Sequence, residues 1–197
     1  MEDGFVRRLP SSILHSLSSF WGRAGCAWLC LGLLALPAQA QVSKEYQIKA
    51  AFLYNFAKFV EWPAQSFAST NSPLVIGVVG KSPFGTELEK VVTNRKINGR
   101  DILVRQIETL AEAGGVHLLF FSAAEDTRAG QTLEDFHSLG ILTVGETEPF
   151  SARGGMIAFL LEGDKVRFDI NVEAAEQAGL KISVQLQKLA KSVRRKK

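Results

Sequence analysis

The chain has 197 residues, of which 46% are hydrophobic and 22% charged, and it contains 2 Cys. This composition is typical of a globular protein and excludes a disordered, a collagen-like or a disulfide-stapled chain. Residues 41–197 carry 20 Lys and Arg against 18 Asp and Glu, which gives a net charge of +2. A balance so near neutrality argues against nucleic-acid binding, because such binding needs a basic face along the whole contact.

The first 40 residues have the pattern of a signal peptide. Three Arg precede the apolar run 26–36, and Ala38-Gln39-Ala40 follows it. A basic start, a short apolar run and a small-residue site predict export with cleavage after Ala40. A bilayer-spanning helix needs about 20 residues, so an uncleaved anchor is the less favoured alternative. We expect a cleaved signal peptide over 1–40 and a single periplasmic domain over 41–197.

Both cysteines, Cys26 and Cys30, lie in this leader. The exported part is then held together by core packing alone and cannot carry out thiol or disulfide chemistry. Its length is that of one domain built around one core.

The segment 43–62 predicts a long amphipathic helix. Ser43 is a suitable N-cap and Pro63 ends the pattern. Apolar and aromatic side chains recur at helical spacing, which favours core packing over a ligand- or partner-binding stripe. The residues that share this face are Ile48, Ala51, Phe52, Asn55, Phe56, Phe59 and Val60.

Short apolar runs alternate with helical stretches between residues 74 and 145. The run 74–80 is rich in β-branched residues, as in a strand buried on both faces. Such alternation favours a parallel sheet covered on both sides. Further strands are expected at 102–107, 116–122 and 141–145, and helices at 84–92 and 126–139.

The pattern changes after Gly154 and Gly155. Strands at 156–161 and 165–170 flank the tight turn 162–164, which predicts an antiparallel hairpin at the edge of the sheet. The two glycines indicate a bulge or a close backbone approach, with a contact loop for a ligand or partner as the alternative. The predicted fold is α/β: a single three-layer domain with a mainly parallel sheet, an antiparallel edge hairpin and helices on both faces.

The C-terminal part predicts two helices and a basic end. Asn171 can cap a short helix that Gly179 ends, and Ser183 can cap a last helix through Val193. A solvated tail is the usual role of such a basic end, and the alternative is attraction to an anionic lipid surface beside the inner membrane. The cations of this end are Lys188, Lys191, Arg194, Arg195, Lys196 and Lys197.

No catalytic or metal-binding pattern is complete. Gly80-Lys81-Ser82 lacks the first glycine of a phosphate-binding loop, and Phe84 replaces the last glycine of a nucleophile elbow. His117 and His137 fall in unrelated elements, and their separation does not match the spacing of metal-binding residues. We therefore predict no enzyme, no metal and no cofactor. In such folds the loop after the first strand often binds a ligand. Gly80, Ser82 and Gly85 are therefore candidate residues for binding a small molecule.

Eight segments, taken in order, resemble the YfiR family of bacterial periplasmic proteins. The resemblance begins with the helix 48–63, which is similar to the opening signature of that family, and covers about residues 46–190. The further segments are 73–78 with 83–85, 97–100, 117–120, 142–145, 154–157, 165–171 and 178–183.

The resemblance implies a regulator without catalysis. Such a protein represses an inner-membrane diguanylate cyclase by binding its periplasmic sensor region, and an outer-membrane lipoprotein can sequester the repressor. A repressor of this kind must bind the inactive cyclase better than the active one. Family members can carry disulfide-forming cysteines in the domain, and residues 41–197 have none. A redox-controlled switch is therefore excluded if the leader is cleaved.

This hypothesis requires a partner-binding surface, which we expect on the hairpin and the C-terminal segment because these lie at sheet edges. The alternatives are a periplasmic small-molecule sensor and, least favoured, an exported hydrolase. Edge strands and aromatic surface suggest a homodimer as a further hypothesis. The residues predicted to contact the partner are Phe168, Ile170, Leu180, Ile182 and Leu186.

Overall fold

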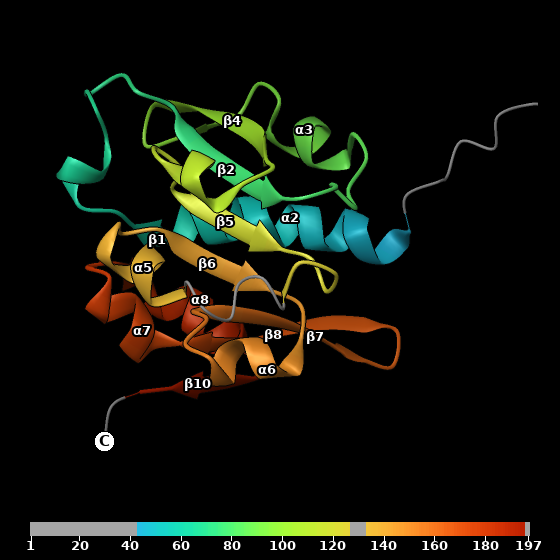
Figure 1. Ribbon diagram of the computed structural model, residues 1–197. Coiled ribbons are helices and arrows are strands. Elements are labelled where there is room, and N and C mark those ends of the chain that lie inside the picture. The colour runs from blue at the N-terminus through green and yellow to red at the C-terminus, as the bar shows by residue number, and fades with distance from the viewer. Residues whose placement is uncertain (1–42, 127–132, 196–197) are drawn as a thin grey trace, which may run out of the picture. The chain divides into compact units, whose positions relative to one another are not determined.

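The first helix of the described chain, α2, covers Lys44–Phe59. The computed structural model describes residues 43–126 and 133–195 (Figure 1). Ser43 caps α2 as predicted, since its hydroxyl accepts a hydrogen bond from the Tyr46 N–H. The helix ends before the predicted residue 62 because a proline, Pro63, favours extended backbone ahead of it. Val60–Glu61 instead forms the short strand β1, which pairs antiparallel with β9 at Lys181–Ile182.

The main sheet has the order β10-β8-β7-β6-β5-β2-β4-β3. Its centre is parallel, as the alternating pattern predicts, and β2 is buried along almost all its length. The β3–β4 and β7–β8 pairs are antiparallel. The strands are β2 (Leu74–Val79), β3 (Lys96–Ile97), β4 (Arg100–Ile107), β5 (Leu118–Phe121), β6 (Leu142–Gly145), β7 (Ile157–Glu162), β8 (Lys165–Asn171) and β10 (Ser192–Arg194).

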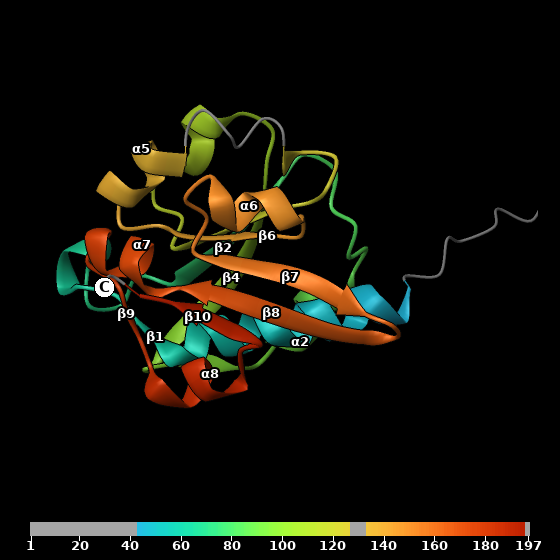
Figure 2. The ribbon, with the colours of Figure 1, turned by 90° about the horizontal axis from the view of Figure 1, so that it is seen from below.

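Two hydrophobic clusters cover the two faces of this sheet. Figure 2 shows α2 and α8 on one face and α5 and α6 on the other, which confirms the three layers. The larger cluster packs α2 against the sheet through Leu53 and Phe56, and the smaller one gathers around Phe121 and Phe150. The further helices are η1 (Ala64–Ser66), α3 (Glu87–Val92), η2 (Leu110–Ala113), α5 (Leu133–Ser138), α6 (Glu148–Ala152), α7 (Val172–Gln177) and α8 (Val184–Leu189).

Two helices differ from their predicted bounds. The helix expected at 84–92 begins at Glu87, because Gly85 has a φ of +55°, which a right-handed helix does not adopt. The helix expected at 126–139 is described from Leu133, and residues 127–132 lie outside the described residues. The short helix α6 was not predicted, since five residues show too little periodicity.

The predicted hairpin is present, but it is not the edge of the sheet along its whole length, because β10 pairs with the last residues of β8. β7 and β8 pair antiparallel around a turn in which Gly163 has a φ of +58°. The last helix stops at Leu189, and residues 192–194 add β10 parallel to β8. The prediction of a helix through Val193 was wrong, because a β-branched residue gains ladder hydrogen bonds there that a frayed helix end lacks.

Gly155 allows a close approach of Phe150. A Cβ at Gly155 would lie 2.1 Å from an atom of the Phe150 ring, and one at Gly145 would lie 2.4 Å from it. The glycines therefore make room for the ring at the centre of the smaller core cluster. Close approach is thus confirmed for Gly155, whereas Gly154, the other member of the predicted pair, takes a positive φ of +101°.

Candidate functional site

The carboxyl ends of the parallel strands form the natural place for a site. β4 lies on one side of β2 and β5 on the other, so the connections after β2 and after β4 run in opposite directions. In doubly wound sheets, ligands bind at the carboxyl ends of the strands where the order reverses in this way. Here that point lies between the ends of β2 and β5.

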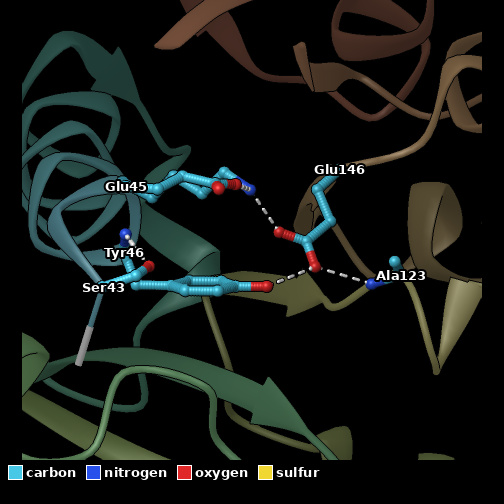
Figure 3. A network of polar contacts seen from close by, with 6 residues as sticks. Ser43, Glu45, Tyr46, Ala123 and Glu146 are labelled. Carbon is cyan, nitrogen blue, oxygen red and sulfur yellow. Dashed lines mark hydrogen bonds and ion pairs between the residues drawn. The ribbon is translucent and has the colours of Figure 1, made fainter. Parts of the chain in front are cut away.

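A buried carboxylate, Glu146, occupies this edge immediately after β6. Its carboxylate accepts hydrogen bonds from the Tyr46 hydroxyl at 3.0 Å and from the Ala123 N–H at 2.7 Å. Figure 3 shows Tyr46 and Ala123 beside the Glu146 carboxylate. Lys49 completes the set, with its Nζ 2.6 Å from the second carboxylate oxygen. The side chains of Lys49 and Glu146 are only 5% and 3% exposed. Because Ala123 lies two residues after the end of β5, this network joins the first turns of α2 to the ends of two strands.

The network leaves no reactive group free. Lys49 also forms an ion pair with Glu45, and its ammonium lies over the Tyr46 ring. Burial, together with the Glu146 carboxylate, raises the pKa of Tyr46 above its usual value, so the phenol stays protonated and donates. A carboxylate that already accepts from three donors has little capacity left as a base. The geometry of Glu146 therefore fits a structural role better than a catalytic one. We call this network, which fixes α2 to the ends of the strands, the clamp.

A second buried carboxylate, Asp126, ties the segment after β5 to α6. Arg153 forms an ion pair with it and also donates to its backbone carbonyl at 3.2 Å. The Thr147 hydroxyl donates to the other carboxylate oxygen. Two acidic residues at this edge are thus both satisfied by the chain itself.

The predicted ligand-binding loop is a folded turn. Gly80 has a φ of +66°, and the Glu125 side chain lies where a Cβ at that position would be. The Ser82 hydroxyl accepts a hydrogen bond from the Phe84 N–H at 3.3 Å, and Gly85 continues the turn in the left-handed region. Phe84 is fully buried between the rings of Tyr46 and Phe120. The chain's own side chains therefore occupy the space that a ligand of this loop would need.

A hydrolytic site cannot be assembled from Ser82 and His117. Ser82 follows the carboxyl end of β2, whereas the His117 ring accepts a hydrogen bond from Val75 at its amino end, 3.1 Å away. A strand of this length separates the two by about 20 Å. The rings of Phe67 and Trp62 enclose His117, and burial lowers its pKa. It is thus a packed neutral histidine.

The structure brings no metal-binding cluster together among residues 43–126 and 133–195. His137 lies 3.0 Å from the Gly154 carbonyl, in a different element from His117. Within the same ranges, no helix combines the length and apolar character that spanning a bilayer requires.

The five residues predicted to contact a partner lie in the core. Phe168 packs against Phe56 and Phe52, with ring centroids 5.0 and 5.4 Å apart. A partner cannot reach side chains that are this deeply buried, so we correct their assignment to core packing. Each of the five, Phe168, Ile170, Leu180, Ile182 and Leu186, is at most 7% exposed.

The exposed apolar side chains of these segments were missed. Leu161 is 54% exposed on the hairpin, and Val184 and Leu189 are 62% and 60% exposed on α8. Helical periodicity could have found Val184, because it lies about 200° around the helix from the inward Leu186. It could not have found Leu189, which lies only about 60° from Leu186 at the last residue of the helix. The sequence does not say which face of the helix is inward.

Leu161 lines a shallow cavity of about 500 Å³ at the end of the hairpin. We call this cavity the hairpin groove. Ile48 and Val166 add apolar surface to it, while Lys44, Glu45 and Asp164 are charged members of its lining. The groove is therefore an apolar surface with a charged rim, formed where α2 begins and where β7 turns into β8.

These features define a doubly wound α/β domain in which the two described carboxylates at the carboxyl edge, Glu146 and Asp126, are paired with the chain's own side chains. A comparison with known families matches residues 46–191 to the family described as YfiR/HmsC-like, and the chain belongs to this family. The YfiR-like family is periplasmic and regulatory.

Solved structures are similar to the chain at low sequence identity. The chain is similar to a conserved domain protein from Vibrio cholerae O1 biovar eltor str. N16961, with a TM-score of 0.52 and 11% identity over 76% of this chain and 60% of that one. A second match is an ABC domain in complex with L-Trp from Streptococcus pneumonia, with a TM-score of 0.46 and 12% identity over 61% of this chain and 55% of that one. The chain thus spans less than two thirds of either protein. No curated protein matches it.

Proposed function

We propose that the protein is a non-enzymatic regulator that binds the periplasmic sensor region of an inner-membrane diguanylate cyclase and represses cyclic di-GMP synthesis. Family membership supports this proposal. The observation that carries it is the pairing of Glu146 with its three donors at the carboxyl edge, where enzymes and solute binders of this fold hold their ligand. Because these described side chains are paired with one another, we place the action of the protein on its surface.

The hairpin groove is the surface that we assign to the cyclase. Its Leu161 side chain is half-exposed beside Ile48 and Val166, so an apolar anchor from the partner can displace water there. Lys44 and Asp164 offer charges of both signs around it, which favours one orientation of the partner. This location keeps the partner near the predicted hairpin, although on other residues.

Repression follows from a difference in affinity. A repressor that binds the inactive cyclase 10⁴-fold better moves the equilibrium from about 1:99 to about 99:1. Sequestration of the repressor by an outer-membrane lipoprotein would reverse this shift, and a homodimer would present two grooves.

The test is a pull-down from solubilised inner membranes with the exported protein and two matched variants. Leu161→Asp places a charge in the hairpin groove, whereas Leu103→Asp makes the same change at a 51% exposed leucine on β4. The wild type and Leu103→Asp should recover a membrane protein with a cytoplasmic cyclase domain, and Leu161→Asp should not. Recovery by all three proteins would refute the groove, and recovery by none would refute the cyclase as partner.

A further inference from the structure

The C-terminal segment forms a cationic face around α8. Residues 180–195 contain no Asp or Glu, and the fold gathers their cations instead of leaving them along a tail. The Arg195 guanidinium donates to the Gln187 side chain, which brings the chain end back beside α8. Lys181 lies two residues before the Ser183 cap of this helix, and that cap donates its N–H to the carbonyl of Phe59 at the end of α2.

Most of these cations have no carboxylate partner among the described residues. Lys191 is the exception, since its Nζ lies 2.6 Å from Glu162. Glu61 faces Lys181 across the β1–β9 pair and offsets part of the charge. Lys58, in the last turn of α2, adds a further cation near the start of α8. We call Lys58, Lys181, Lys188 and Arg195, together with Val184 and Leu189, the α8 face.

The α8 face also presents two large apolar side chains to solvent. Val184 and Leu189 are each about 60% exposed, while Leu186 between them is buried. At 3.6 residues per turn, Val184, Lys188 and Leu189 lie within an arc of about 140° on the outer side of the helix. Figure 2 shows α8 on the outer side of α2, at the border of the domain. A lysine thus separates two protruding apolar groups on a convex surface.

We propose that the α8 face docks on a bilayer surface that carries anionic phospholipids. Lys and Arg side chains are attracted to anionic headgroups, and apolar side chains beside them enter the boundary between headgroups and acyl chains. A fluid interface accommodates a convex helix without matching its shape, whereas a folded acidic partner must provide a complementary hollow. The proposal does not rest on the proposed cyclase partner. Docking would raise the effective concentration of the protein toward any partner in the same membrane.

The experiment measures co-sedimentation of the exported, processed protein with lipid vesicles. One set contains phosphatidylcholine alone, and the other contains one part in three of phosphatidylglycerol. Each Lys or Arg near an anionic surface is worth about five-fold in partitioning, so Lys188→Gln/Arg195→Gln should bind anionic vesicles about 25-fold more weakly. The matched control Lys81→Gln/Lys90→Gln removes the same charge on the β2–α3 segment and should bind like the wild type.

A second pair of variants tests the apolar part of the face. Val184→Ser/Leu189→Ser should weaken binding, whereas Leu103→Ser on β4 should not. Raising the salt from about 0.1 M to about 1 M should release the wild type, because the Debye length falls from about 10 Å to about 3 Å. Absence of wild-type binding to anionic vesicles would overturn the proposal, and so would equal loss in the control variants. Binding to a polyglutamate peptide without binding to vesicles would assign the face to an acidic polypeptide instead.

Discussion

Replacing Glu146 by glutamine tests the clamp at the carboxyl edge. Glutamine keeps an oxygen that can accept from the Tyr46 hydroxyl and the Ala123 N–H, but it removes the negative charge beside Lys49. The Lys49 ammonium is then left buried with a single carboxylate partner, Glu45, at the more exposed side of the network. The variant should therefore lose stability because the ion pair with Lys49 is lost, and not because the hydrogen bonds to Tyr46 and Ala123 are lost.

The magnitude follows from burial. Removing one partner of a buried ion pair costs about 3–5 kcal/mol, because the remaining charge is desolvated without compensation. Glu45 retains part of the attraction, so we expect a loss of about 3 kcal/mol for Glu146→Gln. For a domain of this size, that lowers Tm by about 6–12 °C. Glu45→Gln removes the partner whose side chain is 32% exposed, and it should cost about 1 kcal/mol or less.

The assay is urea unfolding followed by the fluorescence of Trp62, the one tryptophan of residues 41–197. The midpoint should fall clearly for Glu146→Gln and little for Glu45→Gln. Lys49→Met/Glu146→Gln should recover stability relative to Glu146→Gln, because it removes the uncompensated charge. Equal losses for Glu146→Gln and Glu45→Gln would refute the reasoning, since the burial of the pair would then have no energetic consequence.

Three further predictions concern the core and its titration. Because burial lowers the pKa of His117 in the fold, the unfolded chain binds its proton more readily: stability should be constant above about pH 6.5 and fall as the pH drops below it. Unfolding midpoints between pH 7.5 and 5 check this, and an equal decline in His117→Gln would contradict it. Phe168→Ala should cost about 3–5 kcal/mol by opening a core cavity, whereas Val184→Ser should change stability by less than about 0.5 kcal/mol in the same urea assay. The reverse order would show that the core assignment of Phe168 is wrong. Gly155→Ala should cost about 1–3 kcal/mol by overpacking, and Gly114→Ala, which meets no atom within 4 Å, should be neutral by thermal unfolding. Equal Tm values would show that no close approach exists at Gly155.

Local patterns were sufficient for the layers and for most of the elements, but not for α6 or β10. Ser43 and Asn171 were predicted as caps, and each accepts the expected backbone hydrogen bond. The buried run 74–79 and its successors form the parallel strands that the alternation predicts. These features depend on interactions between residues within one turn or one strand. Such residues are close together in the sequence, so a local pattern reveals them.

The candidate site could not be predicted in the same way. Lys49 and Glu146 are 97 positions apart, and only the strand order brings them together. Without that pairing, each looks like an ordinary solvated charge. The loop at Gly80 resembles a ligand site until the side chain of Glu125 is placed against it.

The sequence by itself determined the class of fold, the exported pattern of the leader and the resemblance to the YfiR family, because periodicity, capping and ordered motifs are properties of the linear chain. Only the tertiary structure decided which face of each C-terminal element is buried. Phe168 and Leu186 lie in the core cluster with α2, whereas Leu161 and Val184 are exposed, because α2 packs on one face of the hairpin and of α8. The direction of a face is set by what packs on it, and that is a contact between segments far apart in the sequence.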